Sequence, residues 1–412
     1  MNRRSILAIM AFPVFAASAW SQTATTLREA AEAIGLNIGV ATNSNQVSNA
    51  TSEYATALKT QFNLVVCENE MKFDGTEPSL GRFTYGGGDG VSAFAVASKM
   101  KMRGHNFIWH SQATAAQAAV HDRASGLKVM RDHITAVGGH FKEQILEWDV
   151  LNEIVDNTGL RNATTRPSSF WDANIGDDYA DSALAISRQV LGTNGYLYYN
   201  DYGADGVNTK STTMFNLAKK WQTNKVPIDG IGLQSHLGTG IRKDDISANV
   251  KRFGDIGLRI SMTEIDITSS KTEDWVNLLK ACIENYNCVS FVTWGLSDDR
   301  SWLGSGCHGC LLFSGTATPK TEIIQALIQT MAQADPTVTA KRKEFIKRLP
   351  GATTSILYPL ARSGARREGN GLFGAFPVPV FSNGSGKSMD ALGRNILAPA
   401  KGSFPGLGIL PQ

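Results

Sequence analysis

Two glutamates lie at the ends of buried, strand-like segments of the sequence. Glu153 ends the segment 148–153, and Glu264 lies in the segment 263–266, 111 residues further along the chain. Two carboxyl groups that face each other can supply an acid, a base and a nucleophile, which is the chemistry that cleaves glycosidic bonds. A gap of about 5–5.5 Å between them would make one the nucleophile and the other the acid and then the base, with retention of anomeric configuration. Glu153 and Glu264 are therefore the candidate catalytic pair.

Eight short apolar or β-branched segments alternate with amphipathic segments of helical length. The expected strands lie at residues 34–42, 62–70, 103–110, 146–153, 196–202, 228–236, 258–267 and 289–297. The expected helices lie at residues 51–61, 92–102, 127–145, 181–191, 212–223, 246–253, 274–284 and 322–332. This alternation predicts right-handed βαβ units with a parallel sheet, and eight units over about 300 residues predict an α/β fold, the (β/α)8 TIM barrel. An open doubly wound sheet would need a glycine-rich phosphate turn after an early strand, and the cluster at Gly86, Gly87, Gly88 and Gly90 lacks that spacing.

Polar residues that could assist the glutamates end other expected strands. In a TIM barrel the active-site groups stand at the carboxyl ends of the strands, so residues from the fourth and seventh strands face each other across the mouth. His110 ends the third strand, and Gln234 and His236 share one face of the sixth because side chains alternate along a strand. Glu264 and Asp266 share a face for the same reason. A contact between His236 and Asp266 would hold the imidazole near Glu264 and tune the ionisation of that carboxyl group.

Two tryptophans at the end of the series could bind sugar. Trp294 lies in the eighth expected strand, and Trp302 follows eight residues later. The flat faces of sugar rings are apolar, so aromatic side chains suit them. The mouth of the expected barrel would then hold both the reacting groups and the surfaces that orient a sugar chain.

The composition describes a globular chain with two differently charged parts. Hydrophobic residues make up 42% and charged residues 19%, which excludes collagen, coiled coils and multi-span membrane proteins. The net charge of +3 combines −5 over residues 1–335 with +8 over residues 336–412, which hold eleven Lys or Arg and three Asp or Glu. The basic segment also holds eight of the 13 prolines and eleven of the 40 glycines. We expect it to be largely irregular beyond about Arg348 and to act as a solvated tail, an electrostatic anchor to an acidic surface or polymer, or a sorting segment.

The amino-terminal segment is typical of a secretory signal. Two arginines precede an apolar stretch at residues 6–17 and a group of small residues, which predicts a signal peptide over residues 1–21. The catalytic barrel would then span residues 22–335, with the basic extension at 336–412, and no transmembrane segment is expected. We expect a protein that is secreted or held at the cell surface of a bacterial-type cell.

Export would place the five cysteines in an oxidising compartment, where disulfides form. Cys282 and Cys288 are six residues apart, and Cys307 and Cys310 form a C-x-x-C pair, so either pair could close a local loop. A zinc site would need a second pair of ligands, so no metal is expected. Cys67 lies in an apolar segment and is expected to be a buried free thiol.

Seven motifs, in order between residues 30 and 330, resemble those of glycoside hydrolase family 10, the endo-β-1,4-xylanases. The motifs are CENEMK at 67–72, WHSQ at 109–112, WDVLNE at 148–153, NDY at 200–202, GLQSH at 232–236, TEID at 263–266 and WGLSDDRSW at 294–302. The resemblance implies a TIM barrel that hydrolyses internal bonds of xylan with retention of configuration, with Glu153 as the acid/base and Glu264 as the nucleophile. Xylan would be the partner, and neither a cofactor nor a nucleic acid is implied.

The resemblance also implies a set of sugar-contacting residues. Those on the non-reducing side of the cut are Glu68, Asn69, Lys72, His110, Asn152, Gln234, His236, Trp294 and Trp302. Asn200 and Tyr202 belong to the same substrate-binding set. Asn152 would bond the sugar 2-hydroxyl, an interaction that strengthens in an oxocarbenium-like transition state. A disulfide between Cys282 and Cys288 is implied as well.

The sequence departs from the family pattern in one loop. The family usually has a proline and a tryptophan after WHSQ, whereas this chain reads ATAAQ at 113–117, so a sugar-stacking contact would be absent there or supplied elsewhere. Two other functions stay open. One is a β-1,4-glucanase or mixed xylan and glucan hydrolase on the same scaffold. The other is a non-catalytic polysaccharide-binding protein, which should have lost one of the two glutamates.

Overall fold

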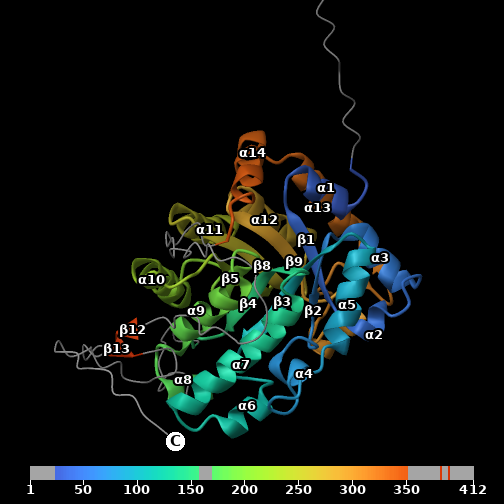
Figure 1. Ribbon diagram of the computed structural model, residues 1–412. Coiled ribbons are helices and arrows are strands. Elements are labelled where there is room, and N and C mark those ends of the chain that lie inside the picture. The colour runs from blue at the N-terminus through green and yellow to red at the C-terminus, as the bar shows by residue number, and fades with distance from the viewer. Residues whose placement is uncertain (1–23, 157–168, 351–380, 383–387, 390–412) are drawn as a thin grey trace, which may run out of the picture.

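Parallel strands form a closed barrel in the computed structural model, which describes residues 24–156, 169–350, 381–382 and 388–389 (Figure 1). The strands are β1 (Asn37–Thr42), β2 (Leu64–Cys67), β3 (Lys101–Ile108), β4 (Ile145–Asn152), β5 (Tyr196–Asp201), β6 (Gly230–Leu233), β7 (His236–Leu237), β8 (Arg259–Ile267) and β9 (Cys288–Thr293). They pair in the order β6-β5-β4-β3-β2-β1-β9-β8, and a pairing of β6 with β8 closes the ring. The two-residue β7 also pairs with β8 and continues the position of β6, so the barrel has eight positions. The predicted TIM barrel is confirmed.

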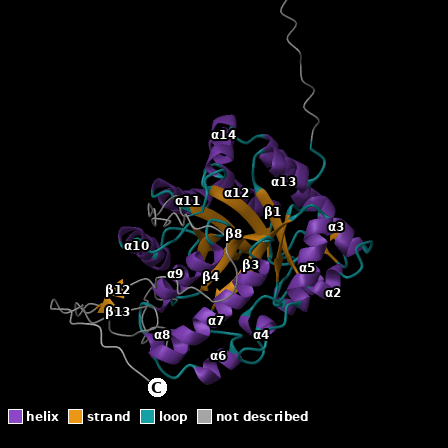
Figure 2. Cartoon of the chain, in the orientation of Figure 1, coloured by secondary structure: helices purple, strands orange, loops and turns teal. Residues whose placement is uncertain are grey.

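A helix follows each strand position and covers the outside of the barrel (Figure 2). These outer helices are α3 (Glu53–Gln61), α5 (Gly86–Ala97), α7 (Arg123–Phe141), α9 (Tyr179–Leu191), α10 (Thr209–Thr223), α11 (Lys243–Asp255), α12 (Thr272–Ile283) and α13 (Thr321–Ala332). Side-chain caps fix several of their starts: Asp122 accepts from the Ser125 backbone N–H before α7, and Asn208 accepts from that of Ser211 before α10. The strand and helix pattern of the sequence therefore corresponds to real elements.

Shorter elements lie in the connections. They are α1 (Leu27–Ala33), α2 (Ser44–Val47), α4 (Phe73–Thr76), α6 (Thr114–Ala119), α8 (Phe170–Ile175), α14 (Pro336–Phe345), the 3-10 turns η1 (Asp298–Arg300) and η2 (Gly304–Gly306), and the strand pairs β10 (Phe313–Ser314) with β11 (Thr318–Pro319) and β12 (Phe381–Ser382) with β13 (Ser388–Met389). The predicted signal peptide and most of the extension after α14 lie outside the described residues. Within the described residues, none of the helices has the length and apolar character needed to cross a membrane.

The largest differences from the expected helix boundaries are in α5 and α7, and α5 also ends at Ala97, because residues 101–102 of the expected helix belong to β3. Helix α5 begins at Gly86, six residues earlier than expected, so the glycine cluster is helical. A Cβ atom at Gly87 would lie 2.6 Å from Glu70 Cγ, and one at Gly88 would lie 2.7 Å from Phe141 Cζ. These glycines therefore permit close helix packing. Helix α7 ends at Phe141, and the last residue of the expected helix, 145, instead begins β4.

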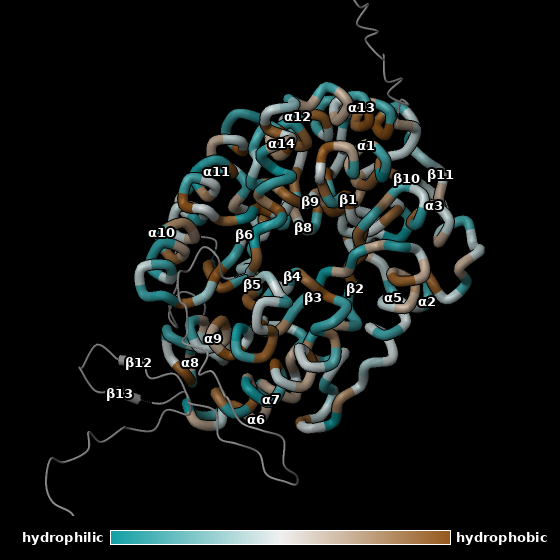
Figure 3. The backbone as a smooth tube through the Cα atoms, turned by 45° about the horizontal axis from the view of Figure 1, so that its top comes forward, coloured by the Kyte–Doolittle hydropathy of each residue, from teal (hydrophilic) through white to brown (hydrophobic). Residues whose placement is uncertain are grey.

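The barrel interior is polar as well as apolar. Figure 3 shows the strands as a ring inside the helices, with hydrophobic segments in both layers. Inside the ring, the buried Arg103 of β3 donates to Glu147 Oε2 at 2.8 Å and to both carboxylate oxygens of Asp149. Burial alone would lower the pKa of Arg103, but the two anions raise it, so it stays charged. A buried ion network of this kind must be fully paired to be tolerated.

Helix α14 closes the opposite end of the barrel from the strand carboxyl ends. Its Arg342 is fully buried and donates to four carbonyl oxygens, those of Ile34, Ile283, Asn285 and Cys288, at 2.7–3.3 Å. These oxygens follow α1, end α12 or begin β9, so one guanidinium joins three elements. Burial lowers the pKa of Arg342 to about 10, so it is a cation at neutral pH.

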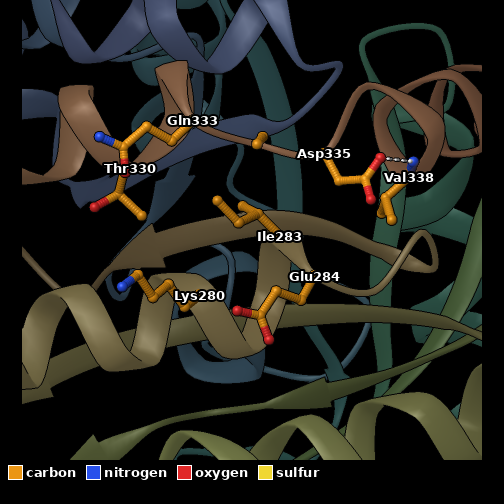
Figure 4. Close-up of a pocket in the computed structure, with 8 residues that line it drawn as sticks. Lys280, Ile283, Glu284, Thr330, Gln333, Asp335 and Val338 are labelled. Carbon is orange, nitrogen blue, oxygen red and sulfur yellow. Dashed lines mark hydrogen bonds between the residues drawn. The ribbon is translucent and has the colours of Figure 1, made fainter.

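A pocket of about 370 Å³ lies beside α14, between α12 and α13 (Figure 4). Its lining residues are Lys280, Ile283, Glu284, Thr330, Gln333, Ala334, Asp335 and Val338. Asp335 caps α14 by accepting from the backbone N–H groups of Thr337 and Val338. None of the catalytic or sugar-binding residues expected from the sequence lines this pocket, so it is separate from the barrel mouth.

Arg342→Ala is expected to lower the free energy of unfolding by about 3 kcal/mol, because several buried carbonyl oxygens would lose a charged donor. Urea unfolding followed by circular dichroism measures the change. The control is Lys343→Ala on the same helix, whose exposed side chain should contribute less than about 0.5 kcal/mol. Equal stabilities of the two variants would contradict the role given to Arg342.

Candidate active site

The two glutamates lie at the same end of the barrel, where the strands finish. Glu264 is in β8 and is 5% exposed, and Glu153 directly follows β4. Glu153 adopts a left-handed backbone conformation with φ of 55°, and its N–H donates to the Asn200 carbonyl at the end of β5. Ser235, which follows β6, has φ of 59°. Such conformations cost non-glycine residues about 1–3 kcal/mol and often mark functional sites, which fits their position at the mouth.

A chain of side-chain amides joins the two carboxylates. Asn200 Nδ2 donates to Glu264 Oε1 at 2.7 Å and to Asn152 Oδ1 at 2.9 Å. Gln234 Nε2 donates to Glu153 Oε1 at 3.1 Å and to the same Asn152 oxygen at 3.3 Å. Three amide residues expected from the sequence thus contact one another and hold the two glutamates in a defined relation.

Two histidines contact the buried Glu264. His236 Nε2 is 3.4 Å from Glu264 Oε2, and His105 Nδ1 is 3.8 Å from Glu264 Oε1. Burial raises the pKa of Glu264, but the charge of His105 and the hydrogen bond and charge of His236 outweigh it, so the net pKa is lowered. His236 also contacts Asp266 Oδ2 through Nδ1 at 2.8 Å. Burial lowers the pKa of His236, yet Asp266 and Glu264 raise it to about 10, so a cation faces an ionised Glu264 at neutral pH.

Glu153 has neutral hydrogen-bond partners instead. Trp109 Nε1 donates to Glu153 Oε2 at 2.9 Å, and the amide of Gln234 binds the other oxygen. The indole of Trp171 donates to the Trp109 carbonyl at 2.9 Å and so anchors the segment that carries Trp109. The two glutamates therefore stand in different environments, one beside two histidines and one among neutral donors.

Lys72 is the centre of a further group of expected sugar-binding residues. Its Nζ donates to Asn69 Oδ1 at 2.9 Å and lies 5.2 Å from the centre of the Trp109 ring and 6.0 Å from that of Trp294. Burial lowers the pKa of Lys72, opposed by the charges of Glu264, Glu68 and Glu153. Burial also raises the pKa of Glu68, which Lys72 and Asn43 oppose. The cluster combines an aromatic surface with donors and acceptors, as sugar binding requires.

The remaining expected residues lie around this centre. Trp302 is 56% exposed, and its Nε1 donates to Asp266 Oδ2 at 2.9 Å. The His110 ring lies 5.8 Å from that of Trp109. The Tyr202 ring has the ammonium group of the buried Lys210 3.6 Å from its centre. The segment 113–117, where the family pattern is missing, enters helix α6, and its Ala116 is buried.

Both cysteine pairs form disulfides. The implied Cys282–Cys288 disulfide is present with an S–S distance of 2.03 Å, and Cys307 and Cys310 are also joined, at 2.08 Å. Cys67 is a buried free thiol, and burial raises its pKa well above the ordinary value.

The family of the chain follows from comparison with known proteins. The sequence model described as "Glycosyl hydrolase family 10" matches residues 26–329. The chain belongs to glycosyl hydrolase family 10. The match covers every strand of the barrel and both candidate catalytic glutamates, and it ends before α14.

Relatives within glycosyl hydrolase family 10 come from fungi and bacteria. Endo-1,4-beta-xylanase 2 of Claviceps purpurea is 35% identical over 264 residues, which cover 64% of this chain and 78% of the relative. Endo-1,4-beta-xylanase B of Neocallimastix patriciarum is 35% identical over 296 residues, which cover 69% of this chain and 33% of that longer protein. The crystal structure of xylanase 10B from Thermotoga petrophila, in complex with xylobiose, has a TM-score of 0.69 and 30% identity, and covers 75% of this chain and 98% of that one.

The structure adds three site residues that sequence reasoning did not name. His105 contacts Glu264, Asp149 binds His105 Nδ1 at 3.1 Å, and Trp109 binds Glu153. One signal was available. Arg103 and His105 are two residues apart in β3, so their side chains lie on the same face of that strand. Polar residues that recur on one face of a buried strand indicate that the barrel interior is polar.

His236→Asn is expected to shift the acid limb of the pH profile of kcat/KM upward. The positive charge of His236 favours the ionised form of Glu264, so its removal raises the pKa of that carboxyl group. Steady-state rates between pH 3 and 8 measure the shift. His140→Asn, on the outer helix α7, is the control and should leave the limb in place. An unmoved acid limb in His236→Asn would mean that this histidine does not set the ionisation of Glu264.

Proposed function

We propose that the protein is an exported, retaining endo-β-1,4-xylanase that hydrolyses internal bonds of xylan by double displacement. The observation that carries the proposal is the contrast between the two carboxylates. Glu264 is buried against two histidines that favour its ionised form, whereas Glu153 contacts neutral donors. An ionised carboxylate is a nucleophile, and a carboxyl group without a cation in contact can hold and release a proton.

In the first step, Glu264 attacks the anomeric carbon of the sugar while the glycosidic C–O bond breaks. The proton of Glu153 passes to the leaving oxygen, so the departing chain ends in a hydroxyl group. The intermediate is an ester between Glu264 and the sugar. Asn152 would bond the 2-hydroxyl, where the interaction strengthens as positive charge develops on the ring.

In the second step, water attacks the same carbon from the side that the first chain has left. Glu153, now a carboxylate, takes the proton of that water, and the bond between sugar and Glu264 breaks. Two displacements restore the original anomeric configuration. The enzyme returns to its starting state with Glu153 protonated and Glu264 ionised, so no cofactor enters the cycle.

Three observations support, in this order, xylan as the substrate, export of the protein, and its attachment through the basic extension. The relatives described above carry the name endo-1,4-beta-xylanase. Two disulfides agree with an oxidising compartment, and hence with the signal peptide expected at residues 1–21. The net charge of +8 over residues 336–412 suits attachment to an acidic cell surface or polymer. The first exposed basic residues of this extension lie in α14 or just after it: Lys341, Lys343, Lys347 and Arg348.

Glu264→Gln is expected to lower reducing-sugar release from xylan by about a thousandfold or more, because an amide cannot form the ester. Xylan and carboxymethylcellulose are compared side by side, with Glu143→Gln in an exposed loop as the control. Unchanged activity of Glu264→Gln would show that Glu264 is not the nucleophile. Faster hydrolysis of carboxymethylcellulose by the unmodified enzyme would instead point to the glucanase.

Glu153→Ala is expected to reduce hydrolysis of xylan far more than that of an aryl xylobioside. The aryl leaving group departs without a proton, so its first step needs no acid. Azide added to the variant should restore turnover of the aryl substrate and yield a glycosyl azide, because a small anion replaces the base-assisted water. Equal losses on both substrates would show that Glu153 is not the acid.

Deleting residues 351–412 is expected to abolish binding to an anionic polymer while activity on soluble xylan stays within about twofold. Retention on a sulfated-polysaccharide column measures binding, and the full chain in 1 M NaCl is the control because salt screens such contacts. Undiminished retention of the shortened chain at low salt would argue against attachment through the extension.

A further inference from the structure

The loop between β9 and β10 carries Trp302 to the catalytic centre. The indole Nε1 donates to Asp266 Oδ2 at 2.9 Å, the same oxygen that His236 contacts at 2.8 Å. His236 in turn contacts Glu264. Because the Trp302 side chain is 56% exposed, burial does little to fix the ring. Its position must come from the backbone of its own loop, which has only the short turns η1 and η2 as regular structure.

The Cys307–Cys310 disulfide lies at the back of this loop. Both cysteines are buried, and they form a small apolar cluster with Leu311 and Leu303. That cluster is separate from the main hydrophobic core of the barrel. A cluster of this size contributes little hydrophobic stabilisation, so the covalent bond and the polar contacts around it are the main constraints on the loop.

The disulfide lies between Trp302 and the end of β8. The Cys310 carbonyl accepts from the backbone N–H of Ile267, the residue after Asp266, at 3.0 Å. Cys310 Sγ lies 3.5 Å from the hydroxyl of Ser301, the residue before Trp302. Cys310 therefore contacts both the segment that carries Trp302 and the segment that carries Asp266, the hydrogen-bond partner of Trp302.

A half-buried ion pair holds the other side of the loop. Lys320 Nζ lies 2.8 Å from Asp298 Oδ2 and donates to the carbonyls of Gly309 and Leu311 at 2.9 and 2.7 Å. Asp298 Oδ1 accepts from the Leu311 N–H at 2.9 Å and lies 3.5 Å from Cys307 Sγ. The ion pair thus fixes the two ends of the C-x-x-C segment around the disulfide.

We propose that the Cys307–Cys310 disulfide is a positioning element for Trp302, and that its loss weakens the binding of the sugar chain without disabling the catalytic glutamates. The proposal rests on the function proposed above, in which Trp302 contacts sugar. The chain offers a matched control, because Cys282–Cys288 is also a short local disulfide. It lies at the opposite end of the barrel, where Arg342 donates to the Cys288 carbonyl.

The first test is steady-state kinetics on xylo-oligosaccharides with both pairs of cysteines replaced in turn. Cys307→Ser/Cys310→Ser is expected to raise KM about fivefold, the order of one lost aromatic contact, while kcat stays within about twofold. Cys282→Ser/Cys288→Ser should lower Tm and leave KM within twofold. In a Trp302→Ala background, loss of Cys307–Cys310 should add nothing to KM. A further fivefold rise there, or an unchanged KM in the first variant, would overturn the proposal.

A second measurement does not depend on activity. The indole N–H signal of Trp302, identified by its disappearance in Trp302→Phe, should exchange with solvent faster in Cys307→Ser/Cys310→Ser and at the original rate in Cys282→Ser/Cys288→Ser. If the cysteine variant fails to fold, a reductant added to folded Cys282→Ser/Cys288→Ser, in which Cys307–Cys310 is the remaining disulfide of the described residues, should also accelerate this exchange. Unchanged exchange would refute the positioning role. An unmodified enzyme that is inactive on xylan would instead refute the proposed function.

Discussion

The pairing of buried Glu264 with two histidines is the interaction on which the active site depends. A carboxylate removed from water costs several kcal/mol unless cations and donors compensate for the lost hydration. His236 and His105 supply that compensation from two different strands, and Asn200 adds a hydrogen bond. Only a closed barrel brings these strands into range of β8. Glu264, the proposed nucleophile, is therefore ionised because the fold surrounds it with these groups.

Each histidine needs its own anion, and this requirement extends through the barrel. Asp149 binds His105 and, on its other side, Arg103, which also pairs with Glu147. This series of contacts therefore runs from the barrel mouth toward the amino-terminal ends of the strands. Since every member is buried, removing one leaves its neighbour unpaired, and the barrel interior acts as one electrostatic unit. A charged carboxylate inside a packed fold therefore requires a polar barrel interior.

The sequence predicted the strands well, and it predicted that Glu153 and Glu264 lie at strand ends on the same side of the barrel, because both features leave local patterns. Each glutamate lies at or near the end of a run of apolar residues, which predicted its location at a strand end before any contact was known. Of the two histidines at Glu264, His236 was predicted and His105 was not. His105 lies in the middle of a strand that is buried on both faces, so periodicity alone does not show which of its residues reach the site. Arg342 was unforeseeable for another reason: its carbonyl partners lie 54–308 residues away, and the contact exists only when α14 docks.

The central claim is that Glu264 forms a covalent bond with the sugar. The direct test is incubation with an activated 2-deoxy-2-fluoro-xylobioside, whose fluorine slows the second displacement, followed by intact mass measurement and peptide mapping. The account predicts a mass increase of one fluorinated xylobiosyl group, located on the peptide that contains Glu264. A label on any other residue, or release of product with inverted anomeric configuration and no adduct, would contradict it.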